Sequence, residues 1–469
     1  MSSIDQEKND FKLKSSTIDQ MFAPECFNII FRYLPSNKDL YSCILVNRYW
    51  ANCAIPILWE SPFKTNNKSK QFPEVIQIYL TFIPIEKNFH NESLINKPLY
   101  DYPSFLKELH FNRFFNSAIA NNCSEALIIK LFKMFSMYPV KLRQLDLSRL
   151  YHSFHNPMIY DVFQNLGYST YSYVILLQHL EHSSMFSRLS YLNCAYHWYV
   201  EKTQIFNALA NICRNIRNLK ATVWCKNEGV ALANLIRSQR CLKEFSLINS
   251  NHFISFPVQS LKSQIESLNS LTFKNMNRNF NFLNSNLVST TLQLNDEDIF
   301  SLIQSTKIIE LKFKNCEGLN LLPTISNFTN LTSLEYTYGS YNIYDNETPI
   351  EILSNLVKMN GKTLENIVFD WHSHGLLECT QLIKNVAEST INLKYLKTPI
   401  YTLEQLTLIL QTQNQLKKLE IRIGNQINPH YALFLFTNTP FNNLKNSIVQ
   451  LYFDSYMNLR LKKINTRNS

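Results

Sequence analysis

Residues 142–147 read Leu-Arg-Gln-Leu-Asp-Leu, the clearest copy of a pattern, L-x-x-L-x-L, that recurs through most of this 469-residue chain. Ile, Phe or Tyr replaces leucine in some copies, and the copies lie about 23 to 36 residues apart, around the period of solenoid repeats. The alternating leucines predict a short strand whose apolar side chains face inward. Leu292 and Leu294 indicate a further, incomplete copy. The other copies begin at Leu106, Leu189, Ile216, Leu242, Leu268, Ile308, Leu331, Leu364, Leu393, Leu416 and Ile448.

Helical periodicity appears between these copies, for example at residues 207–213 and 350–359. No single strand–helix unit can bury its own apolar face, so neighbouring units are expected to stack into one continuous core. The fold class is therefore predicted to be α/β, with parallel strands on the inner, concave face of a solenoid and helices outside. A different α/β array could produce the same pattern and stays open.

Before the repeats, apolar residues follow helical spacing. Phe27, Ile30, Phe31 and Leu34 recur at i, i+3, i+4 and i+7, which predicts a helix with one apolar face. Pro35 is expected to stop this helix, because proline cannot continue the hydrogen-bond pattern.

Two further short helices are predicted directly after Pro35. Ser36 or Asn37 suits the cap of a helix over residues 38–45, and a third helix begins near Asn47 and ends at Pro56. The three helices total roughly forty residues, near the lower limit for a domain that folds alone. This shortage of core indicates a docking module that needs a partner or an attached domain.

The stretch PECFNIIFRYLPSNKDLYSCILVNRYWANCAIPILW, residues 24–59, resembles the F-box family. The resemblance rests on Pro24-Glu25, Asp39-Leu40, Val46-x-Arg48-x-Trp50 and Leu58-Trp59 in order. It implies docking onto a Skp-type adaptor and, through it, onto a cullin. Phe22-Ala23 departs from the family's usual Leu-Pro. The residues that the resemblance places at the adaptor are Phe22, Pro24, Glu25, Phe27, Ile30, Leu34, Leu40, Val46 and Trp50.

Residues 100–455 resemble leucine-rich-repeat proteins, and specifically the F-box subclass that carries such repeats. The asparagine or cysteine usual after each strand is irregular here: Asn112, Asn249, Asn275 and Asn315-Cys316 fit. The predicted organisation is a disordered N-terminus (1–20), an F-box-like helical domain (21–63), a linker or cap (64–100), a leucine-rich-repeat-like solenoid (101–456) and a basic tail (457–469).

Composition argues against most catalytic classes. The chain has only 7 glycines, none clustered, whereas phosphate-binding loops need grouped glycines for close backbone approach. The 10 cysteines form no CxxC pair. The histidine pairs His152/His155, His179/His182 and His372/His374 lack further ligands at metal-site spacing and are interpreted as surface residues. No enzyme activity, cofactor or metal is predicted.

The formal net charge of +10 raises the question of a nucleic-acid partner. The bases are spread along the chain, and neither Lys64–Lys70 nor Arg460–Arg467 forms a long block, so a nucleic-acid site is disfavoured. No secretory signal and no apolar run of membrane-spanning length are present. We therefore expect a cytoplasmic or nuclear protein with no membrane partner.

The resemblance implies a substrate-recognition subunit of a cullin-type ubiquitin ligase, with an unknown protein target bound by the repeats. The alternatives are a non-degradative interaction scaffold, then a basic nucleic-acid-binding solenoid, and then an intrinsic enzyme. Target contact is expected at strand positions between the leucines, including Glu108, His110, Gln144, Asp146, Glu310, Lys312, Glu335 and Glu420.

Overall fold

The computed structural model describes the helical N-terminal region and twelve of the repeat strands, with gaps. The described residues are 23–34, 36–64, 72–83, 98–138, 140–148, 184–195, 202–248, 255–274, 307–314, 328–338, 350–371, 379–413, 415–423, 427, 448–453 and 458–461. Several predictions fall outside them: Phe22, the three histidine pairs, the copy at Leu292/Leu294, and the asparagines Asn249, Asn275 and Asn315.

Helices occupy the N-terminal region and the intervals between strands. They are α2 (Pro24–Arg32), α3 (Asn37–Ile44), α4 (Arg48–Leu58), α5 (Pro73–Leu80), α6 (Phe111–Ala120), α7 (Glu125–Met137), α10 (Thr203–Ile212), α11 (Lys226–Ser238), α12 (Ser255–Ser260), α14 (Ile350–Asn360), α15 (Cys379–Ser389) and α16 (Leu403–Thr412), with short 3-10 turns at η1 (Tyr102–Phe105), η2 (Ser184–Phe186) and η3 (Leu261–Gln264). In the described part of the chain, no helix is long and apolar enough to cross a membrane.

Each described copy of L-x-x-L-x-L contains a strand. The strands are β1 (Glu108–His110), β2 (Gln144–Asp146), β3 (Tyr191–Cys194), β4 (Asn218–Ala221), β5 (Glu244–Ile248), β6 (Ser270–Lys274), β7 (Glu310–Lys314), β8 (Ser333–Tyr338), β9 (Asn366–Trp371), β10 (Tyr395–Ile400), β11 (Lys418–Ile423), β12 (Ile448–Phe453) and β13 (Asn458–Leu461). They follow one another in chain order in an open sheet. The pairs of given register are parallel except β12–β13, which is antiparallel. The α/β prediction with N-terminal helices and parallel strands is confirmed.

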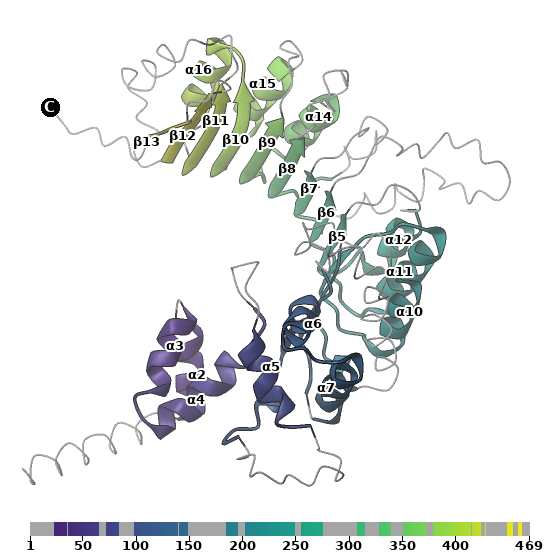
Figure 1. Cartoon of the computed structure of the whole chain (residues 1–469). Coiled ribbons are helices and arrows are strands. Elements are labelled where there is room, and N and C mark those ends of the chain that lie inside the picture. Colours follow the sequence, from purple (N-terminus) through teal and green to yellow (C-terminus); the bar gives the residue numbers. More distant parts are fainter. Residues whose placement is uncertain are drawn as a thin grey trace, which may run out of the picture. The chain divides into compact units, whose positions relative to one another are not determined.

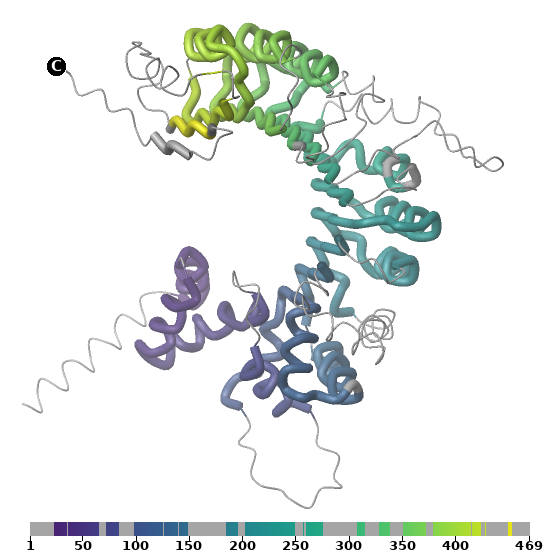
Figure 2. Tube along the Cα trace, turned by 45° about the horizontal axis from the view of Figure 1, so that its top comes forward, coloured from purple at the N-terminus to yellow at the C-terminus, as the bar shows by residue number. Residues whose placement is uncertain are grey.

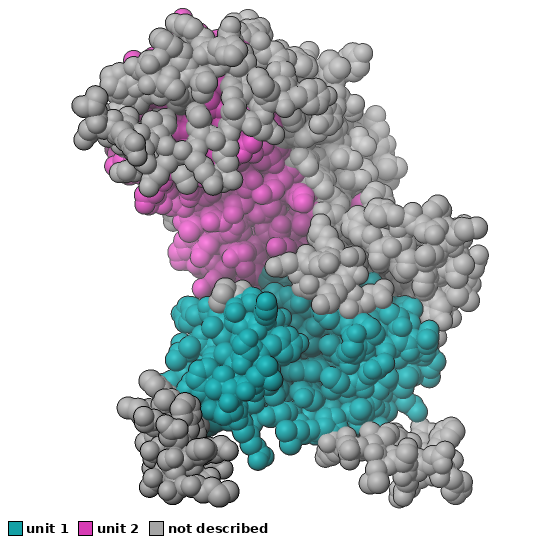
Figure 3. Space-filling view, turned by 60° about the vertical axis from the view of Figure 1, so that its left-hand side comes forward, with its two compact units in different colours: residues 1–192 teal, residues 193–469 magenta. Residues whose placement is uncertain are grey.

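The chain divides into two compact units, residues 1–192 and 193–469 (Figure 3). Within the second unit, α10, α11 and α12 pack in succession, and so do α14, α15 and α16. Each of these helices lies to one side of the strands that it connects, and the tube trace shows the same strand–helix alternation (Figures 1 and 2). The helical periodicity at 207–213 and 350–359 thus corresponds to α10 and α14.

The leucines of the pattern form a buried row across the sheet. In the second unit, Leu219 pairs in register with Phe245, which pairs with Leu271. The row continues through Leu311, Leu334, Ile367, Leu396 and Leu419. All of these side chains are buried. A slip by one residue would turn every one of them to solvent, so the apolar pattern specifies the register.

The last copy departs from the predicted pattern. Ile448, Leu451 and Phe453 are its expected positions, but Val449 pairs with Leu419 and Leu451 pairs with Ile421. Both Val449 and Leu451 are buried. The apolar residues at 449 and 451 satisfy the alternation as well as 451 and 453 do, so sequence spacing alone could not choose between the two registers.

The same arrangement of backbone hydrogen bonds recurs at the start of many of the described strands. The carbonyl oxygen of the residue just before one strand accepts two consecutive N–H groups from the next strand. Arg217 O accepts from Lys243 and Glu244 at 2.8 and 2.9 Å, and Lys243 O accepts from Asn269 and Ser270. The series continues within the second unit at Asn269, Ile309, Thr332, Glu365 and Lys394. A carbonyl has two lone pairs, so each of these bonds can be formed without strain.

Buried amide side chains also join neighbouring repeats, in an array in which an asparagine does not follow every strand. Asn360, at the end of α14, accepts from Leu331 N at 2.8 Å and donates to the Phe328 and Leu356 carbonyls. Gln239, Gln264 and Gln413 make equivalent bonds to backbone groups of adjacent repeats. Each amide satisfies backbone groups that would otherwise be buried without partners.

One helix end differs from the prediction. Pro56 was expected to end the third helix, but α4 continues to Leu58 and Trp59 N donates to Ile55 O at 3.0 Å. Proline removes only its own N–H bond, and its position in the final turn leaves the preceding turns intact.

Asn360→Ala is predicted to lower the free energy of unfolding by about 3 kcal/mol, because it leaves several buried backbone groups without partners. Urea denaturation of the purified chain measures this change. The same substitution at Asn392, which is only partly buried and whose bond to Lys362 O is exposed, serves as the control and should cost about 0.5 kcal/mol or less. Equal effects at the two positions would show that the buried amide does not join the repeats.

Candidate functional site

The three N-terminal helices share a small core. Phe27 and Phe31 of α2, Leu40 of α3, and Cys53 and Ala54 of α4 are buried together. Trp50 packs against both phenylalanines, with ring centroids 5.2 and 5.4 Å apart. These contacts orient α2, α3 and α4 relative to one another.

Caps define where these helices begin. Ser36 Oγ accepts from Asp39 N while the Asp39 carboxylate accepts from Ser36 N, a reciprocal capping box at α3. Asn47 Oδ1 accepts from Trp50 N at 2.8 Å and caps α4. Of the two expected caps for the second helix, Ser36 is therefore the one used.

The same helices expose large apolar side chains that the core does not use. Six of them are between 49% and 84% exposed: Ile29, Ile30, Tyr33, Tyr41, Leu45 and Val46. Ile29 and Tyr33 are four residues apart on α2, and Tyr41 and Leu45 are four apart at the end of α3, so each pair lies on one helix side. We call these six residues the exposed apolar set. Contiguous exposed apolar residues mark interaction surfaces, which makes the exposed apolar set a candidate for one.

The described residues predicted to contact the adaptor fall into three groups by exposure. Pro24, Glu25, Ile30 and Val46 are exposed, Leu34 and Trp50 are half-buried, and Phe27 and Leu40 are buried in the core. Ile30 was expected on one apolar face with Phe27 and Phe31, but the structure separates them: Ile30 is exposed, whereas both phenylalanines lie in the core.

Sequence reasoning overlooked Ile29, Tyr33, Tyr41 and Leu45. The available signal was the number of apolar residues in α2 and α3, which exceeds what one core-facing stripe requires. Four apolar residues off the core period would have indicated a second, exposed face.

Glu60 attaches the helical unit to the first strand. Its carbonyl oxygen accepts from Lys107 N and Glu108 N, both at 2.9 Å, in the arrangement that recurs before the later strands. Its carboxylate forms ion pairs with Arg32 at the end of α2 and with Lys107. The backbone of Glu60 therefore makes for β1 the hydrogen bonds that a preceding repeat makes for later strands.

The ion pairs change the ionisation of Glu60. Burial would raise the pKa of its carboxyl group, but hydrogen bonds from Arg32 and Lys107 outweigh burial and hold the pKa below the ordinary value of 4.5. The folded state therefore favours the charged form.

Aromatic side chains reinforce this attachment within the first unit. Trp59 contacts Tyr79 of α5 edge-on at 5.5 Å, and Tyr79 contacts Phe135 of α7 at 5.0 Å. Phe63 contacts Phe114 of α6 at 5.6 Å. Edge-to-face pairs at these separations add specific geometry to apolar burial. The residues that follow α4 thus pack against α5 and α6, and α5 in turn packs against α7.

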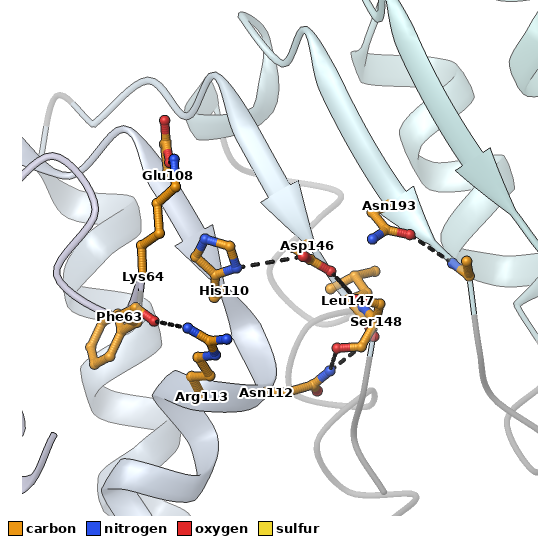
Figure 4. Close-up of polar contacts among 11 residues, drawn as sticks. Phe63, Lys64, Glu108, His110, Asn112, Arg113, Asp146, Leu147, Ser148 and Asn193 are labelled. Atoms are coloured by element: carbon orange, nitrogen blue, oxygen red, sulfur yellow. Dashed lines mark hydrogen bonds and ion pairs between the residues drawn. The ribbon is translucent and has the colours of Figure 1, made fainter. Parts of the chain in front are cut away.

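Three of the predicted target-contact positions on β1 and β2, Glu108, His110 and Asp146, make polar contacts (Figure 4). His110 Nδ1 lies 3.5 Å from Asp146 Oδ2, and Lys64 Nζ lies 3.0 Å from Glu108 Oε2. Asn112 donates to the carbonyls of Leu147 and Ser148. Asn112 follows β1, and these two bonds join it to the residues that follow β2.

This cluster does not have the geometry of a nucleophilic triad. Ser148 donates its hydroxyl to Asp146 at 2.5 Å, so the carboxylate lies between the serine and His110 instead of beyond the histidine. Burial would raise the pKa of Asp146, but hydrogen bonds from His110 and Ser148 lower it. Among the described residues, no group of three or more His, Cys, Asp or Glu could hold a metal ion.

Ion pairs also cross the strand face in the second unit. Lys314 bridges to Glu335 at 2.7 Å, and Asp370 accepts both Lys397 at 2.6 Å and Arg422 at 2.8 Å. Glu310 and Lys312 pair with each other at 2.8 Å. Of the predicted contact residues in this unit, Glu420 is buried, where it pairs with Lys418, and is unavailable to a partner.

Comparison with known proteins gives one family match. A family model described as F-box-like matches residues 24–65, which contain the three helices, the exposed apolar set and Glu60. A search of curated proteins finds no match. An F-box-like domain at residues 24–65 is therefore established, and domains of this type generally bind Skp-type adaptors.

Glu60→Gln is predicted to destabilise the first unit by about 1 kcal/mol near neutral pH, since the partly exposed ion pairs are weakened by solvent screening. The pKa of Glu60 is lower in the folded state, so its contribution is complete above the ordinary value of 4.5 and disappears as pH falls through the folded pKa. Urea denaturation of both forms at several pH values should show their difference shrinking in acid. A difference that grows in acid would contradict the assignment.

Proposed function

We propose that this chain is a substrate-recognition subunit of a Skp–cullin–F-box ubiquitin ligase. The F-box-like domain would bind the adaptor, and the strand–helix array would bind a protein target. The observation that carries the proposal is the exposed apolar set within the segment that matches the F-box-like family.

Adaptor binding is supported by the way the apolar residues of the three helices divide into a buried core and an exposed set. Phe27, Phe31 and Leu40 complete the core, whereas Tyr33 and Leu45 are each 84% exposed. Burying a leucine-sized side chain gains roughly 1.5–3 kcal/mol, so a few such residues supply enough free energy for specific docking. Leaving them in water gives the isolated chain no advantage, which favours a partner that covers them.

The array is proposed to be a leucine-rich-repeat solenoid over residues 101–456. Its support is the twelve strands in chain order, the buried row of leucines and the helix between many neighbouring strands. The half-buried polar positions of the strands, such as Glu335 and Asp370, would meet the target.

In this proposal the chain has no catalytic role of its own and acts in the cytoplasm or nucleus. The adaptor and cullin would bring a ubiquitin-charged enzyme close to the bound target. The chain would then act by raising the effective concentration of target lysines near that enzyme.

The double variant Leu45→Asp with Val46→Asp is predicted to weaken capture of a purified Skp-type adaptor at least about thirtyfold, because it places charge in an apolar interface. Both residues are exposed, so circular dichroism of the variant should match that of the original chain. Surface plasmon resonance measures the affinity.

The matched control is Met137→Asp with Ile391→Asp, which changes two equally exposed apolar residues outside the helical unit. The control should bind the adaptor normally. Full capture by the Leu45/Val46 variant would refute the proposed docking surface. If the Leu45/Val46 variant loses the adaptor in cells and the abundance of the proteins that co-purify with the chain stays unchanged, the chain is a non-degradative scaffold.

A further inference from the structure

Basic residues that are separated in the sequence meet at one edge of the second unit. Arg214 and Arg217 lie in the turn between α10 and β4, and Arg240 and Lys243 lie in the turn between α11 and β5. Arg240 N donates to Arg214 O at 2.9 Å, and Lys243 N donates to Arg217 O at 2.8 Å. The two turns are therefore directly adjacent. We call these four residues the basic edge patch.

The patch is exposed and strongly positive. All four residues are exposed, and the nearest acidic residue in either turn is the exposed Glu244, which begins β5. Within the described part of the chain, Arg217, Arg240 and Lys243 make no ion pair with a carboxylate, unlike the bases Lys307 and Lys394 that precede later strands. Four like charges in two neighbouring turns repel one another and create a local field that attracts an anion.

Local structure accounts for only part of the patch. Arg214 donates to Ala210 O and so satisfies the C-terminal end of α10. Arg217 and Lys243 follow the buried residues Ile216 and Leu242, beyond the last helical turn, where the helix dipole has little effect. Their place in the strand-entry hydrogen bonds uses only backbone atoms, so side chains other than that of proline could fill it.

We propose that the basic edge patch binds an acidic segment of a protein partner. The proposal rests on the proposed function in one respect, that the partner of the array is a protein. Guanidinium groups bind carboxylates through two parallel hydrogen bonds, and three of the four bases are arginines. Adjacent strands lie about 5 Å apart, so a short run of Asp or Glu residues can reach both turns.

A nucleic acid suits the patch less well. Four bases neutralise about four phosphates, fewer than the roughly six to ten contacts typical of strong electrostatic binding to DNA. The two turns also contain no aromatic residue on which an unpaired base could stack. The size and composition of the patch therefore favour a peptide segment.

The test uses the full chain and a fluorescein-labelled peptide of six consecutive glutamates, followed by fluorescence anisotropy. The original chain should bind the peptide with an affinity that falls as salt rises. Arg217→Glu with Lys243→Glu should weaken binding about tenfold or more, since two attractive contacts become repulsive. Arg217→Lys with Arg240→Lys keeps the charge and should give an intermediate loss if paired guanidinium hydrogen bonds contribute.

The control, Lys133→Glu with Lys358→Glu, makes the same change of net charge at exposed helix residues and should bind normally. Equal weakening in the two double variants, or no peptide binding by the original chain at low salt, would overturn the proposal. Tighter, patch-dependent binding of a single-stranded oligonucleotide of equal charge would overturn it in favour of nucleic acid. Every variant should capture the adaptor as the original chain does. Failure to capture the adaptor would therefore count against the proposed function and not against the basic edge patch.

Discussion

Many of the described repeats are positioned by a carbonyl group that accepts two consecutive N–H groups at the start of the following strand. Because this carbonyl precedes the strand, it holds the next strand in register before the strand's own ladder begins. The buried row of leucines and the amides of Gln239, Gln264 and Asn360 depend on that register, because each must meet its counterpart in the neighbouring repeat. A repeat out of register would expose its leucines and leave these amides without partners.

Glu60 extends the same arrangement to the helical unit. Its carbonyl positions β1 as a preceding repeat would, and its side chain forms ion pairs with Arg32 and Lys107. The F-box-like domain is thus attached to the first strand through backbone bonds, ion pairs and the aromatic contacts of Trp59 and Phe63. The exposed apolar set does not contribute to this attachment, which leaves it available to a partner.

The strands and the three helices could be predicted from sequence because both follow simple apolar periods. The identity of the docking residues could not be derived from the period alone. Phe27 and Ile30 both fit it, yet one is buried and the other exposed, since only packing among three helices decides which side faces inward. The basic edge patch could not be predicted from the sequence either. Arg217 and Lys243 are far apart in sequence, and they come together only through the hydrogen bond that joins their turns.

Hydrogen–deuterium exchange of the full chain, with and without a Skp-type adaptor, distinguishes docking on the N-terminal helices from docking on the repeats. The adaptor should slow exchange of amides in residues 29–46 and leave β4 to β12 unchanged, while the N–H groups bound to the strand-entry carbonyls exchange slowly in both states. Protection confined to the repeat strands, or no protection anywhere at saturating adaptor, would contradict docking on the N-terminal helices.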